Sequence, residues 1–274
     1  MQAAVSTAAT SSDSRARAAG PLEAVEAALA AGAVDLPVLP KVAHEVMIAA
    51  RDPKRGAAEV ARAIEKDPAL CATVLRAANS AMFGSTVEIV SARQAVLRLG
   101  LLEVATLATT AAMRSALVDH GGFEQHMQAW WRDALATALF AKEIARLRRQ
   151  AVDSAFLCGL LREVGVPVIL RVLSRSRVAS DAAAVEAALA RHGRTAGLLL
   201  CDAWQLTAPV RAAIADVPDP KYLDHVCTAR IAAALARGQA AAADDVTALN
   251  LYPEELETIV AMASTIAATV ESMA

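Results

Sequence analysis

The stretch DPALCATVLRAANSAMFG, from Asp67 to Gly84, decides the fold of this chain. Asp67 is a favourable helix cap, and Pro68 suits the first helical position. Apolar residues then recur at helical spacing on one face, namely Leu70, Cys71, Val74, Leu75 and Ala78. Asn79 and Ser80 compete with helix continuation, and Gly84 lets the backbone turn away. The stretch therefore predicts an amphipathic helix that packs into a core and ends in a polar corner.

The composition of the 274 residues favours an all-α protein. Hydrophobic residues make up 56% of the chain but aromatic residues only 3%, so most of the apolar side chains are small or aliphatic. Small side chains let helices pack closely. No alternating run of β-branched residues and no Asn-Gly hairpin dipeptide occurs. We expect a flexible tail over residues 1–20 and a helical domain over residues 21–274.

Cysteine spacing indicates the cellular compartment of the protein, and its net charge indicates which classes of partner to expect. The four cysteines lie far apart in the sequence, which predicts reduced core residues in a cytoplasmic protein. No uninterrupted apolar run approaches the roughly 18 to 20 residues of a membrane-spanning helix. The formal net charge of −2 gives no general attraction to nucleic acid or to an anionic membrane. We therefore expect neither of them as a partner.

Two local groups of basic residues are the basis of a nucleic-acid alternative. The first comprises Lys142, Arg146 and Arg149, and the second comprises Arg171, Arg175 and Arg177. Charged stripes on helices mostly face water. We therefore interpret both groups as solvated faces.

Three segments in register resemble the bacterial HDOD domain, a family of signalling relatives of the HD-type metal phosphohydrolases. LPVLPKVAHEVM at residues 36–47 precedes the helix described above, and VSARQAVLRLGLLEVATLA at residues 90–108 follows it. The resemblance rests on the proline-bounded start, the helix that begins with Asp-Pro and ends with Asn-Ser, and the run from Gln94 to Gly100. It implies an all-α, two-lobed fold, with a first lobe over about 33–118 and an HD-like second lobe over about 123–274.

The resemblance also locates the positions of the HD metal ligands, which are a first His, a His-Asp pair and a later Asp. The corresponding residues are Asp133 in WWRDALATALFAKEIA, Arg162 and Glu163 in AFLCGLLREVGVPVIL, and Ala229 in VCTARIAAAL. None of the four is a histidine, and the chain contains no His-Asp dipeptide. The resemblance therefore implies a degenerate site, with no metal, no cofactor and no catalytic residue. We expect Arg162 to pair with Asp133 or Glu163, since buried carboxylates without a metal need another cation.

The function implied by the resemblance is non-enzymatic signal transduction or regulation in bacteria, through protein–protein interaction. The family is associated with environmental sensing, motility, biofilm behaviour and cyclic-di-GMP circuits. Our candidate interaction surface consists of two helix corners, formed by Asn79, Ser80, Arg98 and Gly100, where unpaired backbone groups are open to a partner. A polar helix end that is satisfied locally is an equal interpretation of Asn79 and Ser80. The alternative function is a phosphohydrolase or cyclic-dinucleotide phosphodiesterase with a displaced metal site.

Overall fold

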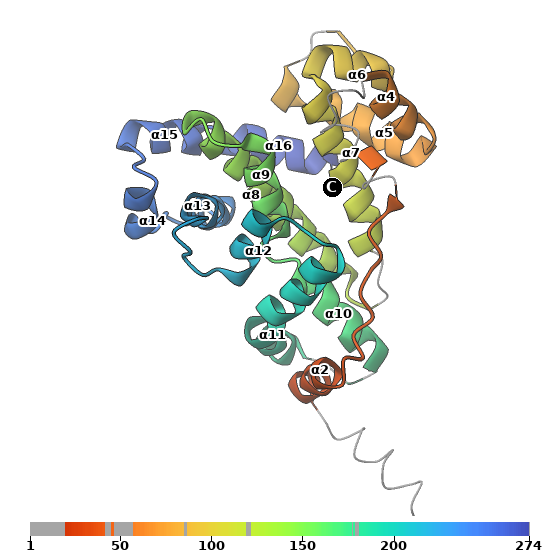
Figure 1. The fold of residues 1–274 in the computed structure, drawn as a ribbon, viewed down its shortest axis with the longest axis vertical. Coiled ribbons are helices and arrows are strands. Elements are labelled where there is room, and N and C mark those ends of the chain that lie inside the picture. Colours follow the sequence, from red (N-terminus) through yellow and green to blue (C-terminus); the bar gives the residue numbers. More distant parts are fainter. Residues whose placement is uncertain are drawn as a thin grey trace, which may run out of the picture.

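The computed structural model describes residues 20–41, 45–46, 57–84, 87–118, 122–176, 178 and 181–273. Within these ranges the chain forms helices and no β-strand, which confirms the all-α prediction (Figure 1). The expected tail, apart from Gly20, lies outside the described residues. No helix in the described ranges is both long enough and apolar enough to cross a membrane.

The helices form two groups along the chain. The first lobe contains α4 (Ala57–Glu65), α5 (Pro68–Ala78), the 3-10 helix η1 (Ala81–Phe83), α6 (Ala92–Leu99) and α7 (Leu101–Leu117). The second lobe contains α8 (Glu124–Leu147), α9 (Val152–Leu161), α10 (Gly165–Ser176), α11 (Ala182–Ala203), α12 (Ala208–Ala215), α13 (Leu223–Ala236), α14 (Ala243–Ala248), α15 (Pro253–Ala261) and α16 (Ala263–Met273). Helix α2 (Pro21–Ala30) comes first in the sequence and packs on α10 and α11 of the second lobe.

Helix α5 begins as its sequence predicts. Asp67 Oδ1 accepts hydrogen bonds from the backbone amides of Ala69, at 3.0 Å, and Leu70, at 3.1 Å. The buried face of the helix consists of Leu70, Val74, Ala77 and Ala78. Cys71 and Leu75, which we expected on the buried face, are only half-buried because they lie at its edge.

Helices α6 and α7 meet at Gly100, whose φ of 90° lies in a region that favours glycine. Ser91 caps α6, since its hydroxyl accepts a hydrogen bond from the amide of Gln94 at 3.1 Å. Gln94 Oε1 in turn accepts from the amide of Val90 at 2.9 Å. These bonds fix where the chain enters α6 and hold residues 87–90 beside that helix.

The second lobe is built around α8, which packs against α9 and α13. Glycines allow the closest approaches between its helices. A Cβ atom on Gly159 of α9 would come within 2.8 Å of the Cα of Ala138 on α8. A Cβ atom on Gly165 would overlap the carbonyl group of Gly193, where α10 crosses α11. Small residues therefore set the spacing of these helix pairs, in line with the alanine-rich composition.

The strap, which we define as residues 32–41, carries the chain from α2 toward the first lobe. The indole Nε1 of Trp204, at the end of α11, donates a hydrogen bond to the carbonyl oxygen of Pro37 at 2.7 Å. Asp35 pairs with Arg171 at 2.8 Å and with Arg175 at 2.6 Å. The strap is therefore fixed to the second lobe. At the other end of the chain, α16 packs on α8 and also on η1 and α5.

A buried ion pair joins the two lobes. Lys142 of α8 pairs with Glu103 of α7, and their side chains are only 3% and 15% exposed. The Lys142 ammonium also lies 5.5 Å from the ring centre of Phe83 in η1. The interpretation of Lys142 as a solvated residue is therefore wrong, and its burial is possible because Glu103 supplies the opposite charge.

Arg149 is exposed, and Arg146 and Arg175 are 47% and 61% exposed, in line with the expected solvated faces, although the latter two also form ion pairs within the chain. Arg146 pairs with Glu143 at 2.6 Å, and the partner of both Arg171 and Arg175 is Asp35 of the strap. Arg177 lies outside the described residues.

The close contact at Gly165 gives the first prediction. We expect Gly165→Ala to lower the free energy of unfolding by about 2 kcal/mol or more, because the added methyl group forces α10 and α11 apart. Gly193→Ala is the matched control, since a Cβ there meets nothing within 4 Å. It should stabilise the helix by up to about 1 kcal/mol. Denaturant unfolding measures both variants, and equal effects would contradict the packing described here.

Candidate functional site

Three of the four positions expected to correspond to metal ligands meet between α8, α9 and α13. Asp133 lies on α8, and Arg162 and Glu163 directly follow α9. All three line one small cavity of about 10 Å³ together with Ala233 of α13. Ala229, the fourth expected position, is fully buried one helical turn before Ala233. The structure thus brings Asp133, Arg162 and Glu163 together, with Ala233 as the residue that α13 contributes.

Arg237, at the C-cap of α13, supplies the cation of this site. Its Nη2 lies 2.7 Å from Asp133 Oδ2 and 2.7 Å from each carboxylate oxygen of Glu163. Its Nε donates a second bond to Asp133 Oδ2 at 3.2 Å. Nearby, the indole Nε1 of Trp130 donates to the backbone carbonyl of Glu163 at 3.0 Å. One guanidinium therefore links α8, the segment after α9 and the end of α13.

The two carboxylates keep Arg237 charged. Burial alone would lower the pKa of the guanidinium, but its hydrogen bonds to Glu163 and Asp133 outweigh burial and raise that pKa above its ordinary value. The site therefore combines one fixed positive charge with two carboxylate groups. A permanent organic cation stands between the acids.

Arg162 does not form the pair that we expected from the sequence. Its Nη1 donates to Asp216 Oδ1 at 3.0 Å instead. The side chain of Asp216 is only 10% exposed, compared with 26% for Asp133 and 38% for Glu163. An ion pair with the more buried acid is screened less by water and salt. The predicted pairing is thus wrong because Asp216 holds Arg162 and Arg237 serves the other two acids.

Asp216 is the centre of a second charge cluster. It ends α12 in the left-handed conformation, with φ of 57°, and pairs with Arg162, Arg194 and Arg230. Arg230 Nε lies 2.7 Å from Asp216 Oδ1, and Arg230 Nη2 donates to the Asp216 backbone carbonyl at 2.8 Å. Burial would raise the pKa of Asp216, but the hydrogen bonds from Arg230 and Arg162 hold it below its ordinary value. One carboxylate thereby fixes side chains from α11, α13 and the end of α9.

The donor set of the Asp133 site does not fit a hydrolytic metal. Such a metal needs imidazole and carboxylate ligands that converge and leave one position open for water. In the part of the chain that the structure describes, no group of three or more His, Cys, Asp or Glu side chains could hold a metal ion. Oxygens of both available acids, Asp133 and Glu163, are bonded to Arg237. The arrangement is that of an ion-pair site.

The residues of the two candidate corners make bonds within the chain. The Asn79 amide donates to the carbonyls of Leu75 and Ile89, both at 2.9 Å, and its oxygen accepts from the Ile89 amide at 2.8 Å. Arg98 Nη1 donates to the Val87 carbonyl at 2.8 Å. Asn79 and Arg98 therefore hold residues 87–89 in place, and any role in partner binding is a prediction beyond these contacts.

Ser80 and Gly100, the other two corner residues, differ in exposure. Ser80 is 6% exposed, and its hydroxyl makes no hydrogen bond to the described residues. Gly100 is exposed at the junction of α6 and α7. Of these two residues, only Gly100 is exposed on the surface.

Exposed aliphatic side chains accompany the second corner, and sequence reasoning missed them. We define the α6 face as Val87, Val90 and Leu97, which are 63%, 63% and 74% exposed. The two valines are held beside α6 because Val87 bonds to Arg98 and Val90 bonds to Gln94. The signal in the sequence was Leu97, which falls opposite the buried α6 residues Ala92, Ala95 and Val96.

The HDOD domain family matches residues 36–220, which is more than half of the chain. One relative, an uncharacterised protein of Treponema pallidum (strain Nichols), is 26% identical over 133 residues. That match covers 48% of this chain and 25% of the relative, so the chain spans only a quarter of that protein.

Several solved structures share the fold. A protein from Shewanella amazonensis, provisionally named a metal-dependent phosphohydrolase, has a TM-score of 0.69 and 23% identity, with 91% of this chain and 97% of that chain covered. An HDOD domain protein of unknown function from Geobacter sulfurreducens has a TM-score of 0.69 and 21% identity, with 93% and 98% covered. A provisionally named signal transduction protein from Marinobacter aquaeolei has a TM-score of 0.65 and 24% identity, with 87% and 60% covered. At these identities the likeness shows the fold alone.

The role of Arg237 can be tested by its removal. Arg237→Ala should lower the free energy of unfolding by about 1 to 2 kcal/mol, because it leaves two neighbouring carboxylates without a cation in a partly exposed site. Arg132→Ala is the control, since Arg132 and its partner Glu271 are 53% and 62% exposed. That change should cost less than about 1 kcal/mol. If denaturant unfolding shows that both variants lose the same free energy of unfolding, Arg237 contributes no more than an ordinary surface arginine.

The Asp216 cluster predicts a specific dependence of stability on pH. A carboxyl group whose pKa is lowered by folding adds stability above its unfolded pKa of about 3.9 and loses it as pH falls further. The stability gap between the wild type and Asp216→Asn should therefore be largest near neutral pH and shrink below about pH 4. Asn is a suitable replacement because it tolerates the left-handed backbone.

The exposed pair between Asp202 and Arg211 provides the control for this experiment. Asp202→Asn should produce a small gap throughout the pH range. A gap for Asp216→Asn that stays constant from neutral to strongly acidic pH would contradict the stabilising ion pairs of Asp216.

Proposed function

Because the chain belongs to the HDOD domain family, we propose that it is a bacterial signal-transduction or regulatory protein that acts by binding another protein and not by catalysis. The observation that carries this proposal is the α6 face. Three large aliphatic side chains, Val87, Val90 and Leu97, are more than half exposed there. Single exposed aliphatic residues are common, but three on a helix and on the segment that hydrogen bonds hold beside it suit burial against a partner.

Two features of the α6 face support a role in recognition. Its backbone is ordered by the bonds from Asn79, Gln94 and Arg98 to residues 87–90, so little conformational entropy is lost when a partner binds. Exposed Arg93 and Gln94 on the same helix can form a polar rim around the aliphatic centre. This combination resembles the anatomy of transient protein interfaces.

The Asp133 site supports the non-catalytic part of the proposal. A hydrolase of this fold would need a metal and an activated water, whereas here Arg237 binds both acids and α13 contributes an alanine. The proposal places the protein in the cytoplasm, in keeping with its four unpaired cysteines. Its partner is a signalling or regulatory protein.

The α6 face gives the prediction that tests this function. Full-length tagged protein is used to capture and identify a partner in the source cell, and the affinity of the purified partner is then measured. Leu97→Ser and Val90→Ser should each weaken that affinity at least about fivefold, through lost apolar burial. Their stability should change by no more than about 0.5 kcal/mol, as for other surface substitutions.

Val260→Ser is the matched control, because Val260 is 48% exposed on α15 of the second lobe. It should leave the affinity unchanged. A partner that binds Leu97→Ser and Val90→Ser as tightly as the wild type would contradict the proposed surface. Metal-dependent hydrolysis of a phosphodiester that is lost in Asp133→Ala would contradict the non-catalytic reading.

A further inference from the structure

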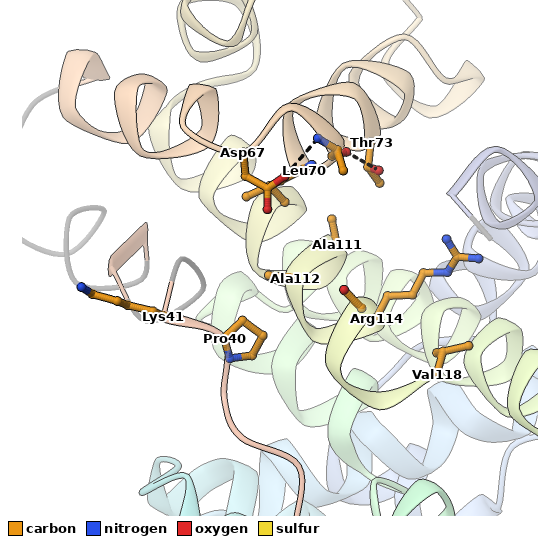
Figure 2. Close-up of a pocket in the computed structure, with 11 residues that line it drawn as sticks. Pro40, Lys41, Asp67, Leu70, Thr73, Ala111, Ala112, Arg114 and Val118 are labelled. Atoms are coloured by element: carbon orange, nitrogen blue, oxygen red, sulfur yellow. Dashed lines mark hydrogen bonds between the residues drawn. The ribbon is translucent and has the colours of Figure 1, made fainter. Parts of the chain in front are cut away.

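A cavity of about 530 Å³ lies in the first lobe, away from both the Asp133 site and the α6 face. Its walls come from the start of α5, the last turns of α7 and the end of the strap (Figure 2). Cavities of about 300 to 1,000 Å³ are typical of small-molecule sites. The volume therefore suits a metabolite and greatly exceeds what one or two waters fill.

The cavity has an apolar floor with polar groups around it. Leu70, Ala111 and Val118 supply apolar surface, and Thr73 and Ser115 supply hydroxyl groups. Thr73 Oγ1 already donates to the Ala69 carbonyl at 2.9 Å and keeps acceptor capacity. Mixed surfaces of this kind, apolar with a few polar groups, orient a bound organic molecule.

Arg114 is the residue of the cavity wall that is best suited to bind an anionic ligand. Its Nε is buried and makes no hydrogen bond to any of the described residues. A buried donor without an acceptor costs about 1 to 3 kcal/mol, and arginine is suited to bidentate binding of carboxylate or phosphate. Nε itself is covered by protein atoms, whereas the half-buried Arg114 lines the cavity, so a bound oxyanion would meet the guanidinium at its other nitrogens and neutralise its charge.

The other charges of the wall set the orientation of a ligand. Asp67 lies at the start of α5, apart from Arg114 in the view of Figure 2, with Ala111 between them. Its carboxylate would repel an acidic group and attract a hydroxyl or amino group. Lys41 of the strap, 89% exposed and paired with Glu45 at 3.8 Å, lies on the outer side of the cavity. The acidic end of a ligand therefore belongs at Arg114 and a hydrogen-bond donor belongs near Asp67.

We propose that this cavity binds a small organic acid that carries a carboxylate or phosphate group, which Arg114 holds, and a hydroxyl or amino group, which faces Asp67. The strap closes one wall through Pro40 and Lys41, and the same strap is fixed to the second lobe through Trp204 and Asp35. A molecule in the cavity therefore touches helices of the first lobe and a segment anchored on the second. This proposal is independent of the proposed partner binding.

The test is calorimetric titration of the full chain with four named probes: glycerol 3-phosphate, malate, adenosine 5′-monophosphate and, as an uncharged reference, glycerol. The phosphate probes and malate distinguish the two kinds of oxyanion. We expect at least one of the three acids to bind with a Kd of about 1 mM or tighter, and glycerol not to bind in that range. Failure of all three acids to bind at this level would overturn the proposal.

Two variants and one control locate the binding. Arg114→Gln should weaken binding at least tenfold by removing the charge, and Ala111→Leu should abolish it by filling the cavity. Arg76→Gln is the control, because Arg76 lies on the exposed side of α5 and does not line the cavity. It should bind like the wild type. Binding that is unchanged in a folded Arg114→Gln or Ala111→Leu variant would overturn the assignment of this cavity.

Discussion

The guanidinium of Arg237 has to neutralise two carboxylates that different helices bring to one place. Asp133 belongs to α8 and Glu163 follows α9, and these helices share the most extensive packing in the second lobe. Gly159 against Ala138 fixes the backbone spacing of α8 and α9. Arg237 follows the last residue of α13, and its side chain reaches both acids. In this lobe the ion pairs of Arg237 connect α8, the segment after α9 and the end of α13.

Ion pairs, some of them buried, recur at several junctions of the molecule. Lys142 and Glu103 join the lobes, Asp216 gathers three arginines, and Asp35 of the strap binds Arg171 and Arg175. Such pairs add little net stability compared with apolar packing, but breaking one partner is costly because a charge is left without its counterion. Our hypothesis is that these pairs help to specify which helices meet, because an alanine-rich core offers close packing but few distinctive shapes.

Local sequence patterns were enough to predict the all-α fold class and the cap at Asp67. The resemblance to the HDOD family, and not a local pattern, implied that Asp133, Arg162 and Glu163 lie near one another. The pairing failed because Arg237 is 104 residues from Asp133 in the sequence and no local pattern connects them. The ion pairs of Asp216 were not predicted for the same reason, because its partners come from three different helices. Exposure of the α6 face and the cavity beside Arg114 depend on tertiary packing, which helical periodicity does not describe.

The claim that an arginine occupies the place of a metal is tested most directly by the metal content of the protein. The full chain is purified without chelator, and the transition metals and magnesium per chain are measured by elemental analysis, with manganese titrated afterwards. The structure predicts far less than one metal per chain and no stoichiometric manganese binding, since Asp133 and Glu163 are bound to Arg237. A content near one metal per chain, lost when Asp133 is replaced by Ala, would contradict the account.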